Sequence, residues 1–127
     1  MSDEQSSRQR SGPLTLGVGQ SELTLTSSDV NALISAMEAW RHMLTKQLDQ
    51  LARDKPQALE AATRRIGRLQ RLEEVLVGKS SRLSDPPLAL DADQAILVQE
   101  TLGELTGYQR GELTGSLREL KVALYRL

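Results

Sequence analysis

The chain has 127 residues and no cysteine, and its 16 basic and 17 acidic residues give a net charge of −1. This composition excludes disulfides, thiol nucleophiles and thiolate metal sites, and it provides no overall field that would attract nucleic acid or an anionic membrane. The apolar residues are almost entirely aliphatic, with one Trp, two Tyr and no Phe, as is typical of helical bundles and coiled coils. We therefore expect a mostly α-helical protein with a single domain over residues 14–127.

The beginning of the chain is polar. Residues 1–13 have mixed charge and no periodicity, so the sequence predicts a disordered tail without the apolar segment of a secretory signal. The longest apolar run in the helical regions, residues 95–98, is far shorter than the ~20 residues that cross a bilayer. We expect a soluble cytoplasmic protein that makes no membrane contact.

Short extended arms are predicted before the first and the last helices. In residues 14–25, apolar and polar residues alternate on both sides of Gly19, a pattern that predicts a small hairpin or two extended arms. A two-stranded hairpin is marginal in water by itself, so it needs a further partner, and residues 88–90 are a candidate. Residues 79–90 otherwise have the composition of a linker.

Residues 26–78 predict an antiparallel helical hairpin. The first helix begins at a capping box in which the Thr26 hydroxyl accepts from the backbone N–H of Asp29, while the Asp29 carboxylate reaches back to the cap. Asp is shorter than the usual Glu, which weakens the box. Apolar residues then recur at spacings of three and four and define one helical face: Val30, Leu33, Ile34, Met37, Trp40, Leu44, Leu48 and Leu51.

The second helix of the hairpin is expected to begin with Asp54 as its cap, Pro56 in its first turn and Gln57 completing a capping box. Gly78 stands where a left-handed C-terminal cap is usual. Only a few residues separate the two apolar stripes, so the helices are expected to pack as antiparallel neighbours. The second stripe consists of Leu59, Ala62, Ile66, Leu69, Leu72 and Leu76.

Residues 91–127 predict one long helix or two shorter ones, which would complete a three- or four-helix bundle. Asp91 is the expected cap, and Gln94 can close its box. Four glycines follow at every fourth position, namely Gly103, Gly107, Gly111 and Gly115. Inside one helix they would cost about 4 kcal/mol relative to Ala, at roughly 1 kcal/mol each. Either another backbone packs against this glycine row, or the helix breaks around residues 107–111.

An apolar stripe runs from the glycines to the end of the chain: Leu113, Leu117, Leu120, Leu124 and Leu127. One continuous helix would be about 54 Å long and would overhang the hairpin. A stripe without a partner does not stay exposed, so the segment either folds back as a fourth helix or meets a second copy. The favoured function is a non-enzymatic protein–protein interaction or assembly module. It would self-associate through the C-terminal helix, as a homodimer or other homo-oligomer, or bind another protein.

No group of residues predicts a catalytic, cofactor or metal site, so we expect no enzyme. His42 lies in the middle of a helix without a nucleophile nearby, which favours a structural or solvated histidine over a catalytic one. The stretch Gly78-Lys79-Ser80 imitates the end of a phosphate-binding loop but follows a helix. Asp85, Asp91 and Asp93 are too few and wrongly spaced for a calcium loop.

Arginines gather on the second helix of the hairpin. Arg64, Arg68 and Arg71 are spaced four and three apart, so they share one face, away from the apolar stripe. Such a face can contact phosphates, and a small nucleic-acid-binding regulator is therefore the alternative function. The competing interpretation is a solvated face, or ion pairs with acidic residues of the C-terminal segment: Glu100, Glu104 and Glu112.

Overall fold

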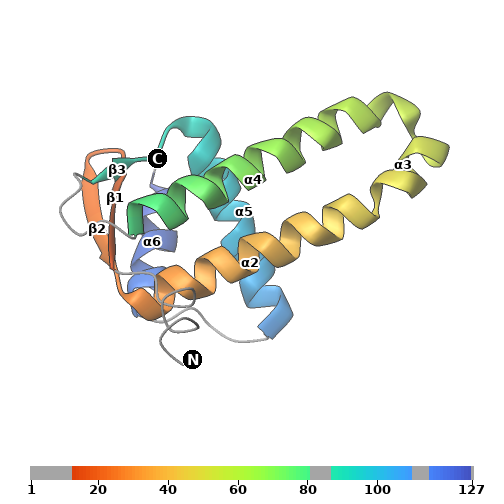
Figure 1. Ribbon diagram of the computed structural model, residues 1–127. Helices are drawn as coiled ribbons and strands as arrows, with labels where there is room; N and C mark the ends of the chain where they lie inside the picture. The colour runs from red at the N-terminus through yellow and green to blue at the C-terminus, as the bar shows by residue number, and fades with distance from the viewer. Residues whose placement is uncertain (1–12, 81–86, 110–114, 127) are drawn as a thin grey trace.

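The computed structural model describes residues 13–80, 87–109 and 115–126, and it shows a mostly helical chain with one small sheet (Figure 1). The expected disordered tail lies, except for Pro13, outside the described residues. The elements in chain order are β1 (Leu14–Val18), β2 (Ser21–Leu25), α2 (Ser27–Lys46), α3 (Leu48–Asp54), the 3-10 turn η1 (Pro56–Ala58), α4 (Leu59–Ser80), β3 (Leu88–Ala89), α5 (Ala92–Gln109) and α6 (Gly115–Tyr125).

A three-stranded sheet of order β2-β1-β3 lies at one end of the molecule (Figure 1). β1 and β2 are antiparallel and joined at Gly19, whose φ of 61° is a left-handed conformation that glycine adopts at no steric cost. β3 pairs with β1 in parallel and brings Ala89 beside Gly17, where an added Cβ would lie 3.4 Å from the Ala89 Cα. The prediction that the hairpin finds a third strand within residues 88–90 is confirmed.

The N-terminal cap of α2 forms as predicted on one side only. The Thr26 hydroxyl accepts a hydrogen bond of 3.2 Å from the Asp29 N–H. The expected return bond is replaced, because the Thr26 N–H donates instead to the Ser116 hydroxyl oxygen at 3.3 Å, and Ser116 donates to the Asp29 carboxylate. The Asp side chain is one methylene shorter than Glu, and the hydroxyl from α6 fills that gap. Ser116 therefore joins the start of α6 to the start of α2.

The helical hairpin formed by α2, α3 and α4 turns at residues other than those predicted. Asp54 is not the cap of the second helix, since it is the last residue of α3. The chain turns at Lys55, and Pro56 opens the 3-10 turn without a side-chain cap. The residue before a proline is disfavoured in the helical conformation, so the break falls at Lys55. A second break at Gln47, which the sequence pattern does not indicate, separates α2 from α3.

Two further helix ends test the sequence pattern. Gly78 does not cap α4, because the helix continues to Ser80 and the backbone at Gly78 is not left-handed. A glycine inside a helix costs only about 1 kcal/mol relative to Ala, which the packing of a long helix tolerates. The box at the start of α5 is complete: the Gln94 N–H donates to Asp91 Oδ1 at 2.8 Å, and the Asp91 N–H donates to Gln94 Oε1 at 3.0 Å.

The C-terminal segment forms two helices rather than one. α5 ends at Gln109 and α6 begins at Gly115, whose φ of 57° is left-handed. Gly111 and Leu113 lie between them, outside the described residues. α6 folds back beside β2 and packs its leucines into the core of the same chain. The apolar stripe was expected either to fold back within the chain or to meet a second copy. Leu117, Leu120 and Leu124 are buried within their own chain.

The core lies where the sheet, α5, α6 and the adjoining halves of α2 and α4 meet. Buried side chains end at Met37 on α2 and resume only at Leu69 on α4. Figure 1 shows the rest of the hairpin extending away from the body of the molecule, with α3 at its far end. We call residues 38–68 the distal hairpin.

Candidate interaction surfaces

The distal hairpin contains aliphatic side chains but no buried one. The apolar stripes of its two helices face each other. Two helices alone do not cover such stripes completely. The third helix, α5, crosses the hairpin only near its base (Figure 1). The distal hairpin therefore keeps its apolar stripes partly exposed, although none of its large apolar side chains is fully exposed. Its partly exposed apolar residues are Trp40, Met43, Leu44, Leu48, Leu51, Leu59, Ala62 and Ile66.

An ion pair joins α2 to α4 at the base of the distal hairpin. Arg41 Nε donates to Glu73 Oε2 at 2.6 Å, and Arg41 Nη2 donates to Glu73 Oε1 at 3.2 Å. The Glu73 side chain is only 8% exposed. The hydrogen bond that Arg41 donates to Glu73 raises the pKa of Arg41 above its ordinary value, so the guanidinium stays charged. Sequence analysis missed this pair, although Glu73 follows Leu69 by four positions within the predicted apolar stripe.

A second contact ties the hairpin to α5. Arg65 pairs with Glu100, and its guanidinium lies 6.0 Å from the centre of the Trp40 ring. The ion pair with Glu100 is thus made by Arg65, which lies off the face of Arg64, Arg68 and Arg71 for which the sequence suggested such pairs. Beside it, a cavity of about 300 Å³ between α2 and α5 is mainly apolar and is lined by Ala32, Ala36, Ala39, Trp40, Met43 and Leu105, among others.

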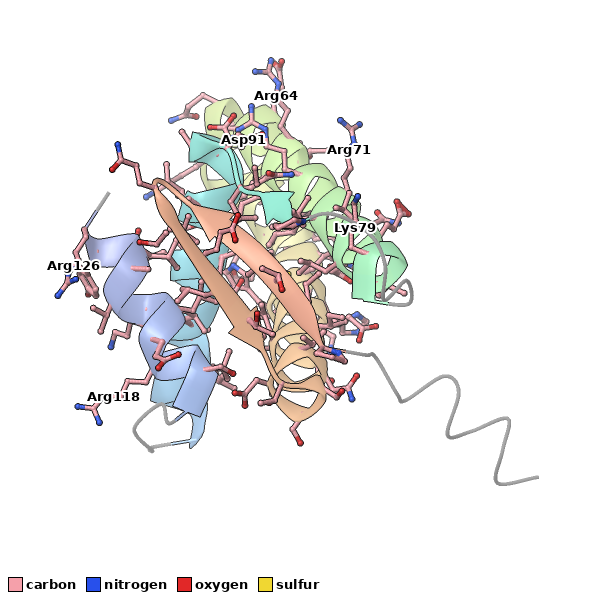
Figure 2. The ribbon with its side chains drawn as sticks, turned by 90° about the vertical axis from the view of Figure 1, so that its left-hand side faces the viewer. Arg64, Arg71, Lys79, Asp91, Arg118 and Arg126 are labelled. Atoms are coloured by element: carbon pink, nitrogen blue, oxygen red, sulfur yellow. The ribbon has the colours of Figure 1, made fainter. Side chains whose placement is uncertain are left out.

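The outer face of α4 carries the three arginines that the sequence singled out. Figure 2 shows Arg64 and Arg71 projecting from α4 away from the body of the molecule. Arg64 pairs with Glu60, one turn earlier on the same helix. Arg68 and Arg71 are exposed and form no ion pair with a described residue. This face thus holds two arginines that are available to a ligand.

The glycine row and the leucines of α6 do not form one exposed face. Gly103 lies in α5, and a Cβ added there would meet no atom within 4 Å. Gly107 lies in the last turns of α5, whereas Gly115 opens α6. The leucines of α6 face the interior of the chain, with exposed fractions of 5, 0 and 3% for Leu117, Leu120 and Leu124.

The other residues considered in the sequence do not assemble a site. His42 is exposed on α2, and Gly78-Lys79-Ser80 ends a helix. Asp91 is used as a cap, Asp93 lies in the first turn of α5, and Asp85 is outside the described residues. Within residues 13–80, 87–109 and 115–126 there is no cluster of three His, Cys, Asp or Glu side chains suited to a metal ion. In the same ranges, no helix combines the length and apolar character needed to cross a bilayer.

Three surfaces therefore stand out in the described part of the chain: the distal hairpin, the outer face of α4, and an open groove beside α6. Comparison of the chain with models of protein families, with curated proteins and with solved structures gave no match.

Proposed function

We propose that the chain is a non-enzymatic assembly module in which the distal hairpin packs against the distal hairpin of a second copy. The observation that carries this proposal is that residues 38–68 hold an apolar stripe on both helices and yet bury no side chain. Two hairpins packed face to face would make a four-helix arrangement, in which each stripe is covered on its open side.

A second copy fits this surface for two reasons. A two-fold axis presents the same patch to itself, and an aliphatic patch is complementary to its own copy. The charged residues around the stripes have both signs, with Asp49, Asp54 and Glu60 among Lys46, Arg53 and Lys55. A partner hairpin can therefore set acidic residues against basic ones, which gives the pairing a preferred register.

The surface proposed for self-association is the distal hairpin, whereas the sequence pattern favoured the C-terminal helix. The leucines of α6 are occupied within the chain, and the glycine row is divided between two helices. The apolar side chains of the distal hairpin, by contrast, are only partly buried within the described part of the chain.

The double substitution Leu48→Glu with Leu51→Glu is expected to weaken pairing strongly. Both side chains lie on α3 and are half-buried in the isolated chain, so the glutamates would place charges in the contact. We expect the dimer dissociation constant to rise about 100-fold, because completing the burial of two leucines in each chain contributes about 3 kcal/mol. Sedimentation equilibrium measures the constant, and circular dichroism checks that helix content is retained.

The matched control is Ile96→Glu, which makes the same kind of change on α5 at a side chain that is already 52% exposed. It should leave the dissociation constant unchanged. A wild-type chain that stays monomeric at millimolar concentration would contradict the proposal.

A nucleic-acid-binding regulator is the second candidate, and the exposed Arg68 and Arg71 support it. Changing Arg64, Arg68 and Arg71 together to Glu is then expected to abolish binding of a fluorescein-labelled DNA duplex. The salt dependence of wild-type binding should have a slope of about −0.9 per neutralised phosphate. Fluorescence anisotropy at several salt concentrations measures both. The double variant Arg118→Glu with Arg126→Glu controls for net charge, and a wild-type chain that binds neither this duplex nor single-stranded RNA at low salt ends this candidate.

A further inference from the structure

The cavity of about 300 Å³ between α2 and α5 has small residues along one wall. Figure 1 shows α5 crossing α2, and two crossing helices diverge on either side of their contact, so side chains have to fill the space between them. On α2 this space is faced by Ala32, Ala36 and Ala39, which recur at spacings of four and three and so share one face. Their methyl groups leave open a space that larger side chains would fill.

The rest of the lining is mainly apolar. Trp40 and Met43 continue the wall that the alanines begin on α2, and Leu105 faces them from α5. An apolar cavity of about 150 Å³ is enough to hold a benzene molecule, and it offers water few hydrogen bonds. The cavity beside Trp40 therefore has room for a compact apolar molecule larger than benzene.

Two polar side chains on opposite walls add hydrogen-bond acceptors to this apolar space. Glu104 lies on α5, is half-buried, and its carboxylate forms no ion pair with a described residue. Glu100, one turn earlier on the same helix, is already paired with Arg65. Ser35 contributes a hydroxyl from α2. A few placed polar groups in an apolar pocket fix the orientation of a ligand, and a carboxylate with a hydroxyl suits a cationic donor.

We propose that this cavity binds a compact apolar molecule that carries one primary amine. The apolar body fills the space beside the three alanines, and the ammonium group donates hydrogen bonds to Glu104 and Ser35. The inference does not rest on the pairing proposed for the distal hairpin. The test of that pairing changes Leu48 and Leu51 on α3, and neither residue lines the cavity.

The chain contains its own reporter of binding, because Trp40 is its only tryptophan and lines the cavity. The probe is phenethylamine, titrated while the tryptophan fluorescence is followed, and phenethyl alcohol is the uncharged comparison. We expect a saturable change with the amine and about fivefold weaker binding of the alcohol, since a half-buried ion pair is lost. The variant Leu48→Glu with Leu51→Glu should bind the amine as the wild-type chain does, so the two proposals can fail separately.

The substitution Glu104→Gln tests the role of the carboxylate with little change in size. It should weaken binding of the amine about fivefold and leave binding of the alcohol unchanged. The matched control is Glu74→Gln on α4, where the side chain is exposed and does not line the cavity. It should change the affinity for neither ligand.

The substitution Ala36→Leu tests the cavity itself, because an isobutyl group in place of the methyl group occupies the space of the ligand. We expect both ligands to bind at least tenfold more weakly, whereas Ala61→Leu on the exposed face of α4 should have no effect. Circular dichroism checks that both variants keep their helix content. The proposal is overturned if the wild-type fluorescence shows no saturable change at millimolar amine, if Glu104→Gln and Glu74→Gln weaken binding equally, or if the folded Ala36→Leu variant binds as the wild-type chain does.

Discussion

Replacing Leu120 with alanine is expected to lower the free energy of unfolding by about 2–5 kcal/mol. Leu120 has no exposed surface, and it lies on the face of α6 that packs into the core beside β2 and α5. Removing its branched end leaves a cavity that the sheet and α5 cannot close without losing their own contacts. Urea unfolding followed by circular dichroism measures the loss.

The control is Val122→Ala on the same helix. Val122 is 44% exposed, so its truncation should change stability by no more than about 0.5 kcal/mol. Sedimentation of the Leu120→Ala variant should match that of the wild-type chain. A variant with unchanged stability but a weaker association would instead place Leu120 in a contact between chains, as the sequence alone suggested.

The substitution Glu73→Gln is expected to cost about 2–3 kcal/mol, because it leaves the Arg41 guanidinium facing a neutral amide in a mostly buried site. Arg41 makes two hydrogen bonds to the carboxylate, so both are weakened by one change. The pair lies where the covered part of the hairpin meets the distal hairpin. The variant should therefore unfold at lower urea concentration, and the amide protons of α2 beyond Met37 should exchange faster.

A double-mutant cycle separates the pair from its surroundings. Replacing both partners with apolar residues, Arg41→Met with Glu73→Leu, should restore stability to within about 1 kcal/mol of the wild-type value, since no unpaired charge remains. Arg41→Met alone and Glu73→Leu alone should each lower the free energy of unfolding more than the double change does. If the costs of the single changes simply add, the bidentate contact does not contribute to stability.

The sequence by itself determined the features that depend on near neighbours. The cap at Thr26 and the box formed by Asp91 and Gln94 are contacts between residues three apart, and Gly19 needs only its own freedom at positive φ to close the hairpin. The predicted starts of α2 and α5 are therefore correct. Where two local signals compete, the pattern fails, as it does at Asp54, because Pro56 decides where the turn falls.

The tertiary structure alone decided what covers each apolar face. A spacing of three and four shows which side chains share a face, but it carries no information on the element that packs there. The stripe from Val30 to Leu51 is uniform in sequence, yet only its part up to Met37 is buried. The stripe of α6 looked unpartnered in sequence and is covered by its own chain. The contacts of Ser116 with Asp29 and of Arg41 with Glu73 join residues far apart in the chain, so only folding reveals them, and with them the surfaces that are left for partners.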